Sequence, residues 1–443
     1  GISLKKIQKA LQTFTPPAGR LQKIKESKQF EVYIDFAHTP NSLENVLVLL
    51  RKKAMTKGGN LITVFGCAGE RDVSKRSMMG EISGRLSAMS VFTAEDPRSE
   101  RVESIIEEMV EGALKSGAKE FSIDAGEKIK KKSNKHLFVR IPERGEAISF
   151  VVQKLAQKKD IVVICGKGHE KSMAYDGTEH PWSDQVAVKN ALTTRKNVAA
   201  VVLAAGLGTR LNSRLPKVLH KIAGRAMLAY TIQTIRAARV GEIVIVVGYG
   251  KDLVKKKIGG AVTFAFQKNP KGGTAQATIV GLKKVSNDIE NVLVLYGDDS
   301  AFYEAETIEA VIDSHKRMGA MVSFVTLIKV DPTGLGRIVR DGSGRLLGIV
   351  EEKDATEAQR KIKEINDGLY VFNKNWLVKN LPIVKKSLVT GEYYLVNLIA
   401  VAIKRKEKVN VFRLKDEKEW FGVSTRQQLA EAKKKMEERF KNV

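Results

Sequence analysis

A glycine-rich segment at residues 203–217 carries residue types that could hold a nucleoside triphosphate. Gly206 and Gly208 let the backbone turn tightly and leave its N–H groups bare, and such groups can bind phosphate oxygens. Arg210 and Lys217 add two cations, which could neutralise a triphosphate while one of its bonds is exchanged. The segment therefore indicates phosphate binding, and it is more specific as a whole than its glycines are alone.

A second position suited to chemistry is Asp298, which follows an apolar run at residues 291–295. A carboxylate at the end of a strand and beside a glycine is a common metal position, and Mg²⁺ takes oxygen ligands. The alternative is an Asp298 side chain that only caps the next turn. Asp299 follows directly and could hold a metal-bound water.

Four polar clusters in the first half of the chain each follow a short apolar run, and they cover residues 35–40, 66–72, 95–98 and 166–170. If the apolar runs are parallel strands, the clusters lie together at the carboxyl ends of those strands, where such sheets bind ligands. Taken singly, each cluster could be ordinary loop chemistry, and a lone His38 or His169 is more often structural than functional.

The elements that must position these residues alternate between strands and helices, which predicts an α/β fold with parallel strands. In the first half we expect strands at residues 30–35, 61–65, 90–93 and 161–165, and helices at 4–14, 42–53, 74–86, 103–116, 145–157 and 183–192. In the second half we expect strands at 198–204, 242–247, 262–266 and 291–295, and helices at 227–238, from 273 onward, at 392–404 and at 426–439.

The length of 443 residues exceeds what one ordinary core can organise, so two or three domains are expected. We expect a helix and a stiff Pro16-Pro17 connector over residues 1–20, a first domain over 21–195 and a second over 197–443. A basic connector near residues 194–198 separates the two halves, and each half is expected to fold alone.

Composition narrows the class of protein. The two cysteines, Cys67 and Cys165, exclude a disulfide framework and a four-cysteine zinc site, and both are expected to be buried thiols. No apolar run reaches membrane-spanning length and no signal peptide opens the chain, so we expect a cytoplasmic protein without a membrane partner. The net charge is +26, but no basic run is interleaved with aromatics. We therefore expect anionic substrates rather than specific nucleic-acid binding.

Residues 197–430 resemble the uridylyltransferase domain of the bacterial GlmU proteins, which act on N-acetylglucosamine 1-phosphate. The resemblance rests on residues 203–224, 272–277, 296–298, 335–338, 349–355, 365–368, 391–395 and 422–426. It implies a nucleotide-diphospho-sugar transferase fold of the GT-A-like kind, the substrates UTP and N-acetylglucosamine 1-phosphate, and Mg²⁺ as cofactor.

The same resemblance implies roles for individual residues, with Arg210 and Lys217 as the catalytic cations. The nucleotide would be bound by Leu203, Ala205, Gly206, Gly208, Thr209, Gln267, Gly273 and Thr274. The sugar would be bound by Gly336, Glu351, Asn366, Glu392 and Tyr394, and Mg²⁺ by Asp298 and Ser424. The chain departs from the family pattern at Ser424, where relatives have Asn, at Asp299-Ser300 and Val396-Asn397, and by one extra residue between Gln267 and Gly273.

The four polar clusters resemble those of the C-terminal domain of the Mur ligases, most closely the UDP-N-acetylmuramoyl-tripeptide synthetases (MurE-like). That resemblance implies an incoming amino acid bound by Arg71, Asp96, Arg98, Gly166 and Glu170, and an ATP-facing rim at Asp35 and His38. Arg98 would suit a distal carboxylate and favours meso-diaminopimelate. Asp96 stands where the family has Asn, so lysine remains an alternative.

No P-loop of the form G-x-x-x-x-G-K-[ST] occurs in the sequence, and no match to the family's carbamylated lysine is found. Residues 1–20 resemble the end of the family's central domain, and the chain starts with Gly1, so we expect a processed product or a fragment. We expect no ligase activity from this chain alone, and the missing ligase domains are possible partners. No hexapeptide repeat occurs, so acetyl transfer is not expected.

The combined expectation is a Mg²⁺-dependent uridylyltransferase fused to the amino-acid-binding part of a ligase, both serving peptidoglycan precursor synthesis. One alternative is a related sugar-1-phosphate nucleotidyltransferase that uses dTTP or another hexose phosphate. The other is a non-catalytic binding protein in which Ser424 has disabled the metal site.

Overall fold

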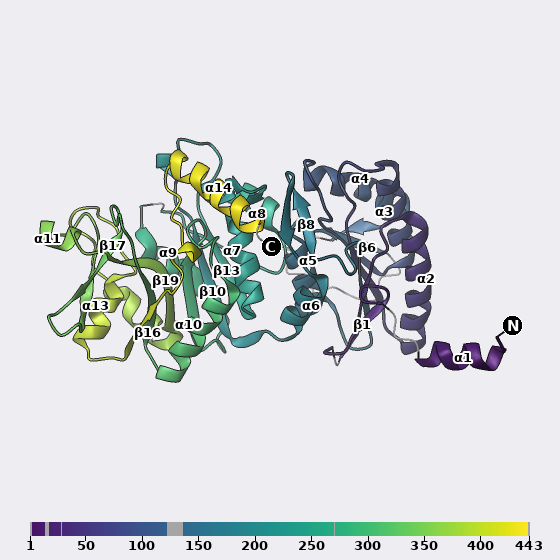
Figure 1. Ribbon diagram of the computed structural model, residues 1–443, viewed down its shortest axis with the longest axis horizontal. Coiled ribbons are helices and arrows are strands. Elements are labelled where there is room, and N and C mark those ends of the chain that lie inside the picture. Colours follow the sequence, from purple (N-terminus) through teal and green to yellow (C-terminus); the bar gives the residue numbers. More distant parts are fainter. Residues whose placement is uncertain (1, 14–16, 28, 122–135, 270, 442–443) are drawn as a thin grey trace. The chain divides into compact units, whose positions relative to one another are not determined.

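The computed structural model describes residues 2–13, 17–27, 29–121, 136–269 and 271–441 of the chain (Figure 1). The chain divides into two compact units, Gly1–Leu192 and Thr193–Val443. Each unit has its own sheet and its own buried core, so the α/β class predicted from strand–helix alternation is confirmed. Within the described ranges, no helix combines the length and the apolar character needed to span a membrane.

The first unit is built on a seven-stranded sheet whose strands are parallel except at one edge. Its order is β1 (Gln22–Ile24), β2 (Glu31–Asp35), β7 (Ile161–Cys165), β3 (Leu61–Phe65), β4 (Met89–Phe92), β6 (Leu137–Arg140) and β5 (Lys119–Glu120), and only β1 runs antiparallel to its neighbour. The four predicted strands are confirmed. The strands β1, β5 and β6 were not predicted, and the edge strands β1 and β5 have only two or three residues, which give no readable alternation.

The helices of this unit are α1 (Leu4–Thr13), α2 (Pro40–Lys57), α3 (Ser74–Leu86), α4 (Val102–Lys115), α5 (Arg144–Phe150) and α6 (Asp184–Leu192). Apolar side chains of α2, α3 and α4 pack on the sheet in one cluster. The hairpin of β8 (Ser172–Tyr175) and β9 (Thr178–Pro181) was not predicted. Phe14 and Pro16, at the predicted helix end and connector, lie outside the described residues.

Two predicted helices of this unit differ from the observed ones. The helix expected at 145–157 is α5 followed by a π-helical turn at Val151–Leu155, so it does not continue as one α-helix. Helix α2 is longer than predicted, because the Thr39 side chain caps its first turn by accepting from the Ser42 N–H. Gly58 then ends it in the left-handed conformation, which glycine adopts without a steric penalty.

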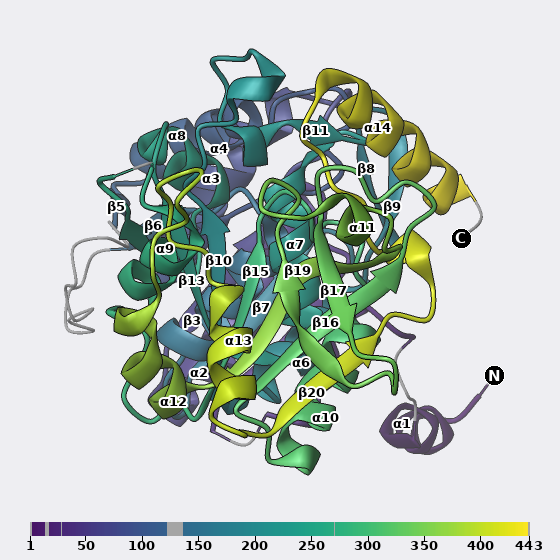
Figure 2. The same cartoon turned by 90° about the vertical axis from the view of Figure 1, so that its left-hand side faces the viewer.

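The second unit contains a nine-stranded mixed sheet. Seven strands follow the order β14 (Thr263–Phe266), β13 (Val240–Val247), β10 (Arg195–Ala204), β15 (Asn291–Tyr296), β19 (Glu364–Asn373), β16 (Val322–Ile328) and β20 (Val409–Arg413). The strands β17 (Gly336–Arg340) and β18 (Leu346–Val350) extend from β19. The first four strands are parallel, and β19 is antiparallel to both of its neighbours in this order (Figure 2).

Strand β10 shows how the sequence divides the two cores of this unit. Val198, Ala200 and Val202 face a cluster that includes residues of α7 (Met227–Ala237), α8 (Lys251–Ile258) and α10 (Ala305–Met318). The alternate residues Ala199 and Val201 face a cluster with α9 (Gly273–Leu282), α12 (Lys374–Asn380) and α13 (Asn397–Lys404). This alternation requires a fully buried central strand with helices on both faces.

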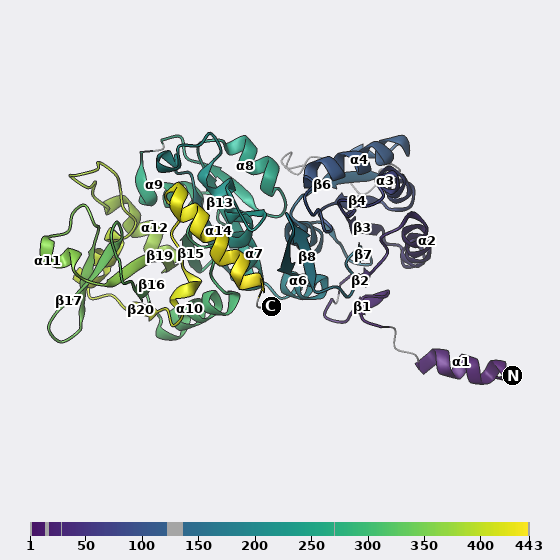
Figure 3. The same cartoon turned by 45° about the horizontal axis from the view of Figure 1, so that its top comes forward.

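Side chains of the helix α14 (Arg426–Lys441), drawn in yellow in Figure 3, pack in one buried cluster with residues of α7. Ala432 and Met436 of α14 share a buried cluster with Met227 and Tyr230 of α7. Val423 belongs to the same cluster, so the packing of α14 fixes the segment just before it. The small elements β11 (Lys221–Ile222), β12 (Arg225–Ala226) and α11 (Glu357–Arg360) complete the unit.

Two predicted boundaries in this unit are corrected. Strand β10 begins at Arg195 rather than Val198, because Arg195 pairs with Val240 and forms an ion pair with Asp313 of α10. The helix expected at 392–404 begins only at Asn397. Residues 392–395 are instead drawn out of helical geometry by hydrogen bonds to the start of α9, which the amphipathic sequence pattern could not reveal.

Candidate functional site

The glycine-rich segment leaves the carboxyl end of β10 as an open loop. Gly208 has φ +63°, and a Cβ there would lie 3.0 Å from Cβ of Lys217, so this position needs glycine. At Gly206, by contrast, a Cβ would meet no described atom within 4 Å. Gly206 is exposed, so its backbone is open to a ligand from outside the loop.

Lys217 lies beside the carboxylates of Asp298 and Asp299, which follow the carboxyl end of the central strand β15. Lys217 forms an ion pair with Asp298, and its Nζ lies 3.9 Å from Oδ1 of Asp299. Burial alone would lower the pKa of Lys217, but the charges of Asp298 and Asp299 raise it, so the ammonium is kept charged. Burial and the neighbouring Asp298 charge raise the pKa of Asp299 to about 7. Two crowded carboxylates with one lysine favour a further cation.

The segment before α14 reaches the same carboxylates. The Val423 N–H donates to Oδ1 of Asp299 at 3.3 Å, which places Ser424 beside the acidic pair. The Ser424 N–H donates to Oε1 of Gln428 at 2.8 Å. Among the described residues, no three His, Cys, Asp or Glu side chains converge as a ready-made metal site. The side-chain oxygens of Asp298 and Ser424 are nevertheless of the type that Mg²⁺ accepts, and this ion often takes one or two protein ligands and completes its shell with phosphates and water.

Arg426 also belongs to this arrangement, although the sequence analysis gave it no role. Its guanidinium donates to the carbonyl oxygen of Leu211 at 3.0 Å and to that of Asn212 at 2.8 Å. The glycine-rich loop is thereby fastened to the segment that carries Ser424. The arginine at the end of the motif 422–426 was the available signal.

The start of α9 carries further residues that were predicted to bind the nucleotide. Gly273 has φ +77°, and a Cβ there would lie 2.6 Å from the Tyr393 carbonyl oxygen. The Ala275 N–H donates to that oxygen, and the Leu395 N–H donates to Oγ1 of Thr274 at 2.9 Å. The Gln267 amide donates to the Gly273 carbonyl oxygen at 3.4 Å. Gln267, Gly273 and Thr274 are therefore brought together despite the extra residue between them.

The residues expected to bind a sugar come from β17, β19 and the loops after β18 and before α13. Gly336 pairs with Asn366 across the sheet, and a Cβ at Gly336 would lie 3.5 Å from Oε1 of Glu351. Burial raises the pKa of Tyr394, and the nearby charges of Glu392 and Glu351 add to that shift. The five predicted sugar residues thus gather in one region.

Asn366 offers the clearest free binding group in this region. Its Nδ2 donates to the Tyr370 hydroxyl at 2.6 Å, whereas its buried Oδ1 has no hydrogen-bond partner among the described residues. A buried carbonyl oxygen without a partner is costly, so it is suited to receive a donor from a ligand. Tyr296 lies between this region and the carboxylates: burial raises the pKa of its hydroxyl, the charges of Glu351 and Asp299 add to that shift, and a hydrogen bond with Thr274 opposes it.

In the first unit, the predicted rim residues Asp35 and His38 and the predicted amino-acid-binding residue Asp96 are already held by protein groups. Asp35 accepts from the N–H groups of Leu21 at 2.6 Å and Ala37 at 2.8 Å. Asp96 accepts from Lys167 at 2.7 Å and from the Ala174 N–H at 2.9 Å. His38 Nδ1 lies 2.9 Å from the Phe36 carbonyl oxygen. These contacts fix the conformations of the loops, so Asp35 and His38 have a structural role in addition to any contact with a ligand.

Lys167 joins two of the predicted amino-acid-binding residues, because its ammonium also lies 2.5 Å from Oε2 of Glu170. The sequence analysis missed Lys167, as well as Glu95, whose burial raises its pKa to about 7. Oε2 of Glu95 has no partner among the described residues, and a Cβ at Gly166 would lie 2.5 Å from it. Arg71 is exposed, and Arg98 is half-buried with φ +53°.

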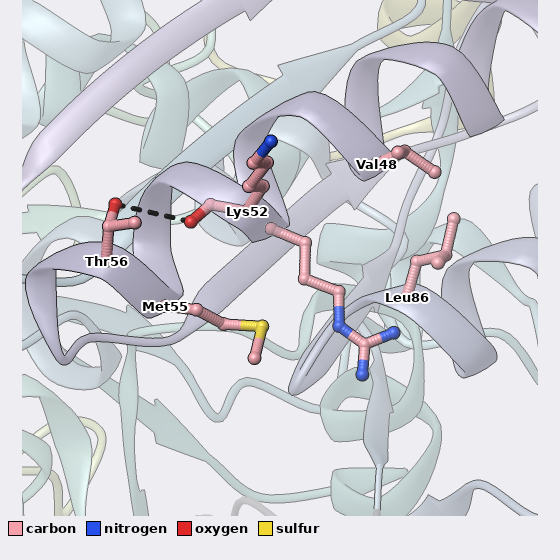
Figure 4. A pocket seen from close by; sticks show the side chains of 6 residues that line it. Val48, Lys52, Met55, Thr56 and Leu86 are labelled. Atoms are coloured by element: carbon pink, nitrogen blue, oxygen red, sulfur yellow. Dashed lines mark hydrogen bonds between the residues drawn. The ribbon is translucent and has the colours of Figure 1, made fainter.

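An apolar groove lies elsewhere on the first unit, between α2 and the end of α3 (Figure 4). Val48, Met55 and Leu86 line it together with the stems of Arg51 and Lys52 and with Thr56. The groove contains none of the residues predicted to bind substrate. Its lining is suited to an apolar contact rather than to acid–base chemistry.

Comparison with known families finds a different family model for each half of the chain. Residues 199–439 match the family model described as nucleotidyl transferase, and residues 19–168 match the model described as Mur ligase, glutamate ligase domain. Both resemblances drawn from the sequence are thereby confirmed.

Several curated relatives of the transferase half are named bifunctional protein GlmU. The chain is 38% identical over 242 residues to that of Heliobacterium modesticaldum, covering 55% of this chain and 52% of the relative. It is 39% identical over 243 residues to that of Pelotomaculum thermopropionicum (55% and 53%) and 40% identical over 242 residues to that of Brevibacillus brevis (55% and 52%). The chain therefore spans about half the length of the curated relatives it matches.

Proposed function

Because the chain belongs to the nucleotidyl transferase family, we propose that its second unit transfers a uridylyl group from UTP to N-acetylglucosamine 1-phosphate and releases pyrophosphate. The observation that carries the proposal is the convergence of Lys217, Asp298 and the 423–424 segment at the open glycine loop. Pyrophosphate release that requires both substrates is the test. Identity to relatives named GlmU supports this pair of substrates over dTTP or another hexose phosphate.

The proposed reaction needs no covalent intermediate on the protein. A phosphate oxygen of the sugar phosphate attacks the α-phosphorus of UTP in line, and the bond to the bridging oxygen of the pyrophosphate group breaks. Arg210 and Lys217 supply positive charge to the phosphates, and the 206–208 backbone offers N–H donors. Asn366, Glu351 and Tyr394 hold the sugar so that its phosphate oxygen is correctly placed.

Asp298 and Ser424 are the residues that would hold Mg²⁺, and the ion would neutralise phosphate charge in the transition state. Asp298 would bind as the directly coordinated anion. Ser424 has a shorter side chain than the asparagine of relatives, so we propose that its hydroxyl contacts the ion through a water. The hydrogen bond from the Val423 N–H to Asp299 would hold Ser424 at the correct distance.

This assignment predicts how activity depends on the Mg²⁺ concentration. Ser424→Asn should lower the Mg²⁺ concentration for half-maximal rate, because an amide oxygen can reach the ion directly. Ser424→Ala should change that concentration little, since it removes only a water-mediated contact. Magnesium titrations of initial pyrophosphate release would measure both variants. A large loss of rate in Ser424→Ala at saturating Mg²⁺ would instead identify Ser424 as a direct ligand.

Gly206 gives a test of ligand approach that does not disturb the fold. Gly206→Ala should leave the thermal unfolding midpoint unchanged, because the added Cβ meets no described atom within 4 Å. It should still raise the KM for UTP by about tenfold, since a methyl group would push phosphate oxygens from the bare N–H groups. Gly342→Ala, at a glycine without a positive φ where the added Cβ also meets no described atom within 4 Å, is the control for adding a methyl group to a loop. An unchanged KM in Gly206→Ala would show that the triphosphate lies elsewhere.

For the first unit we propose a binding site for an amino acid that carries a distal carboxylate, within a ligase of cell-wall peptide precursors. Its support is the match of residues 19–168 to the Mur ligase model and the grouping of Asp96, Lys167 and Glu170. Calorimetry with meso-diaminopimelate and with lysine would test the proposal. Stronger binding of diaminopimelate that is lost in Arg98→Ala is the expected result.

A further inference from the structure

Two separate segments of the second unit, each carrying a residue proposed to bind Mg²⁺, are hydrogen-bonded to one buried residue, Asp367. The Tyr303 hydroxyl, at the end of the segment that starts with Asp298, donates to Oδ2 of Asp367. The indole N–H of Trp420, just before Ser424, donates to the Asp367 carbonyl oxygen at 3.0 Å. Asp367 itself follows Asn366 directly in β19.

The burial of Asp367 argues that these bonds are strong constraints. The residue is 4% exposed, and its second carboxylate oxygen accepts from the Leu369 N–H at 2.9 Å. A buried carboxylate is unfavourable unless its oxygens are hydrogen-bonded, so the surrounding groups are held to these positions. Tyr303 and Trp420 are also almost fully buried, so bulk water does not compete for these hydrogen bonds.

We propose that Asp367 is a positioning residue. It fixes the position of Asn366 relative to two other segments, the one from Asp298 to Tyr303 and the one from Trp420 to Ser424. The inference rests on the proposed function, because it concerns where the sugar phosphate and Mg²⁺ are held. Asp367 contacts neither of them and acts only through its neighbours. A second hydrogen bond, from the Val423 N–H to Asp299, links the same two segments beside Asp298 and Ser424, the residues proposed to hold Mg²⁺.

Kinetic constants separate positioning from simple stabilisation. Tyr303→Phe and Asp367→Ala should raise the KM for N-acetylglucosamine 1-phosphate and the Mg²⁺ concentration for half-maximal rate by about 10- to 100-fold, as loss of an orienting neighbour does. The KM for UTP at saturating Mg²⁺ should change less than about twofold, because no hydrogen bond among the described residues joins Tyr303 or Asp367 to the glycine loop or to the start of α9. Equal changes in all three constants, or an unchanged sugar-phosphate KM, would contradict the proposal.

Asn380 provides a matched control. It is also a fully buried polar residue, whose amide donates to the Trp376 carbonyl oxygen and accepts from Arg405. Asn380→Ala should therefore lower the thermal unfolding midpoint as the Asp367 variant does, yet leave the KM values unchanged. If it raised the sugar-phosphate KM to the same extent, the effect of Asp367 would be one of stability alone.

Amide hydrogen exchange on the full chain without ligands tests, independently of catalysis, whether Asp367 fixes the relative positions of these segments. Tyr303→Phe removes one hydroxyl only, and it should increase the exchange rate of the Val423 amide by at least about tenfold, although Tyr303 does not bond Val423. Asn380→Ala should leave that amide at the wild-type rate. A wild-type rate in Tyr303→Phe would overturn the positioning role, whereas an inactive wild-type enzyme with the expected exchange would refute only the proposed reaction.

Discussion

Asp298→Asn should reduce uridylyl transfer by about 10³-fold or more, the largest effect we expect from a single substitution. Asp298 forms an ion pair with Lys217 and is the anion proposed to contact Mg²⁺ directly. The amide keeps the size of the side chain but removes the charge that would hold the ion. The loss should appear in kcat at saturating UTP and should be relieved only in part by raising the Mg²⁺ concentration.

The control for this variant is Asp288→Asn, which changes an exposed aspartate before β15. It should retain wild-type activity. Thermal unfolding of Asp298→Asn would check that the fold survives. If this variant folded normally and kept more than about a tenth of the wild-type rate, Asp298 would not be a ligand of an essential ion.

Lys217→Ala should lower the rate by about 10²- to 10³-fold, as removal of a preorganised charge does in other enzymes. Lys217 is mostly buried beside two carboxylates that keep it protonated. Its loss would remove positive charge from the phosphates and leave Asp298 and Asp299 crowded without a cation. Steady-state pyrophosphate release at several Mg²⁺ concentrations would measure the effect.

Lys217→Arg and Lys283→Ala are the matching controls. Arginine keeps the charge but not the compact ammonium, so Lys217→Arg should recover part of the rate. Lys283 is exposed after α9, and its replacement should have no effect. A normal rate in Lys217→Ala would assign the ion pair with Asp298 to stability alone.

The sequence analysis predicted some of the regular elements in which one periodicity dominates, but it did not predict the strands β16, β19 and β20 or the helix α10. Strands such as β3 and β7 are continuous buried apolar runs between polar loops, and helix α3 has the bounds that its sequence predicts. The chemistry-bearing loops were also predictable in place, because ligands of α/β sheets gather at the carboxyl ends of strands. Lys217 and Asp298 meet there even though they are far apart in sequence.

The remaining features depend on contacts that no local pattern encodes. Residues 392–395 look helical by amphipathicity, but Gly273 accepts the close approach of the Tyr393 backbone, and the chain is drawn onto α9. Glu95 was overlooked because its neighbours in the motif were more suggestive, and only burial distinguishes it. Asp367 was given no role beyond its place in the motif that contains Asn366, since its partners Tyr303 and Trp420 lie more than fifty residues away.

The most direct test of the account is pyrophosphate release by the full chain with UTP, N-acetylglucosamine 1-phosphate and Mg²⁺. Parallel reactions should replace UTP by dTTP, replace the sugar phosphate by glucose 1-phosphate, or omit one substrate. The account predicts release that requires both substrates and Mg²⁺, with UTP and N-acetylglucosamine 1-phosphate giving the highest kcat/KM and UDP-N-acetylglucosamine formed in equal amount. Absence of release with every pair, or a clear preference for another nucleotide or sugar phosphate, would contradict it.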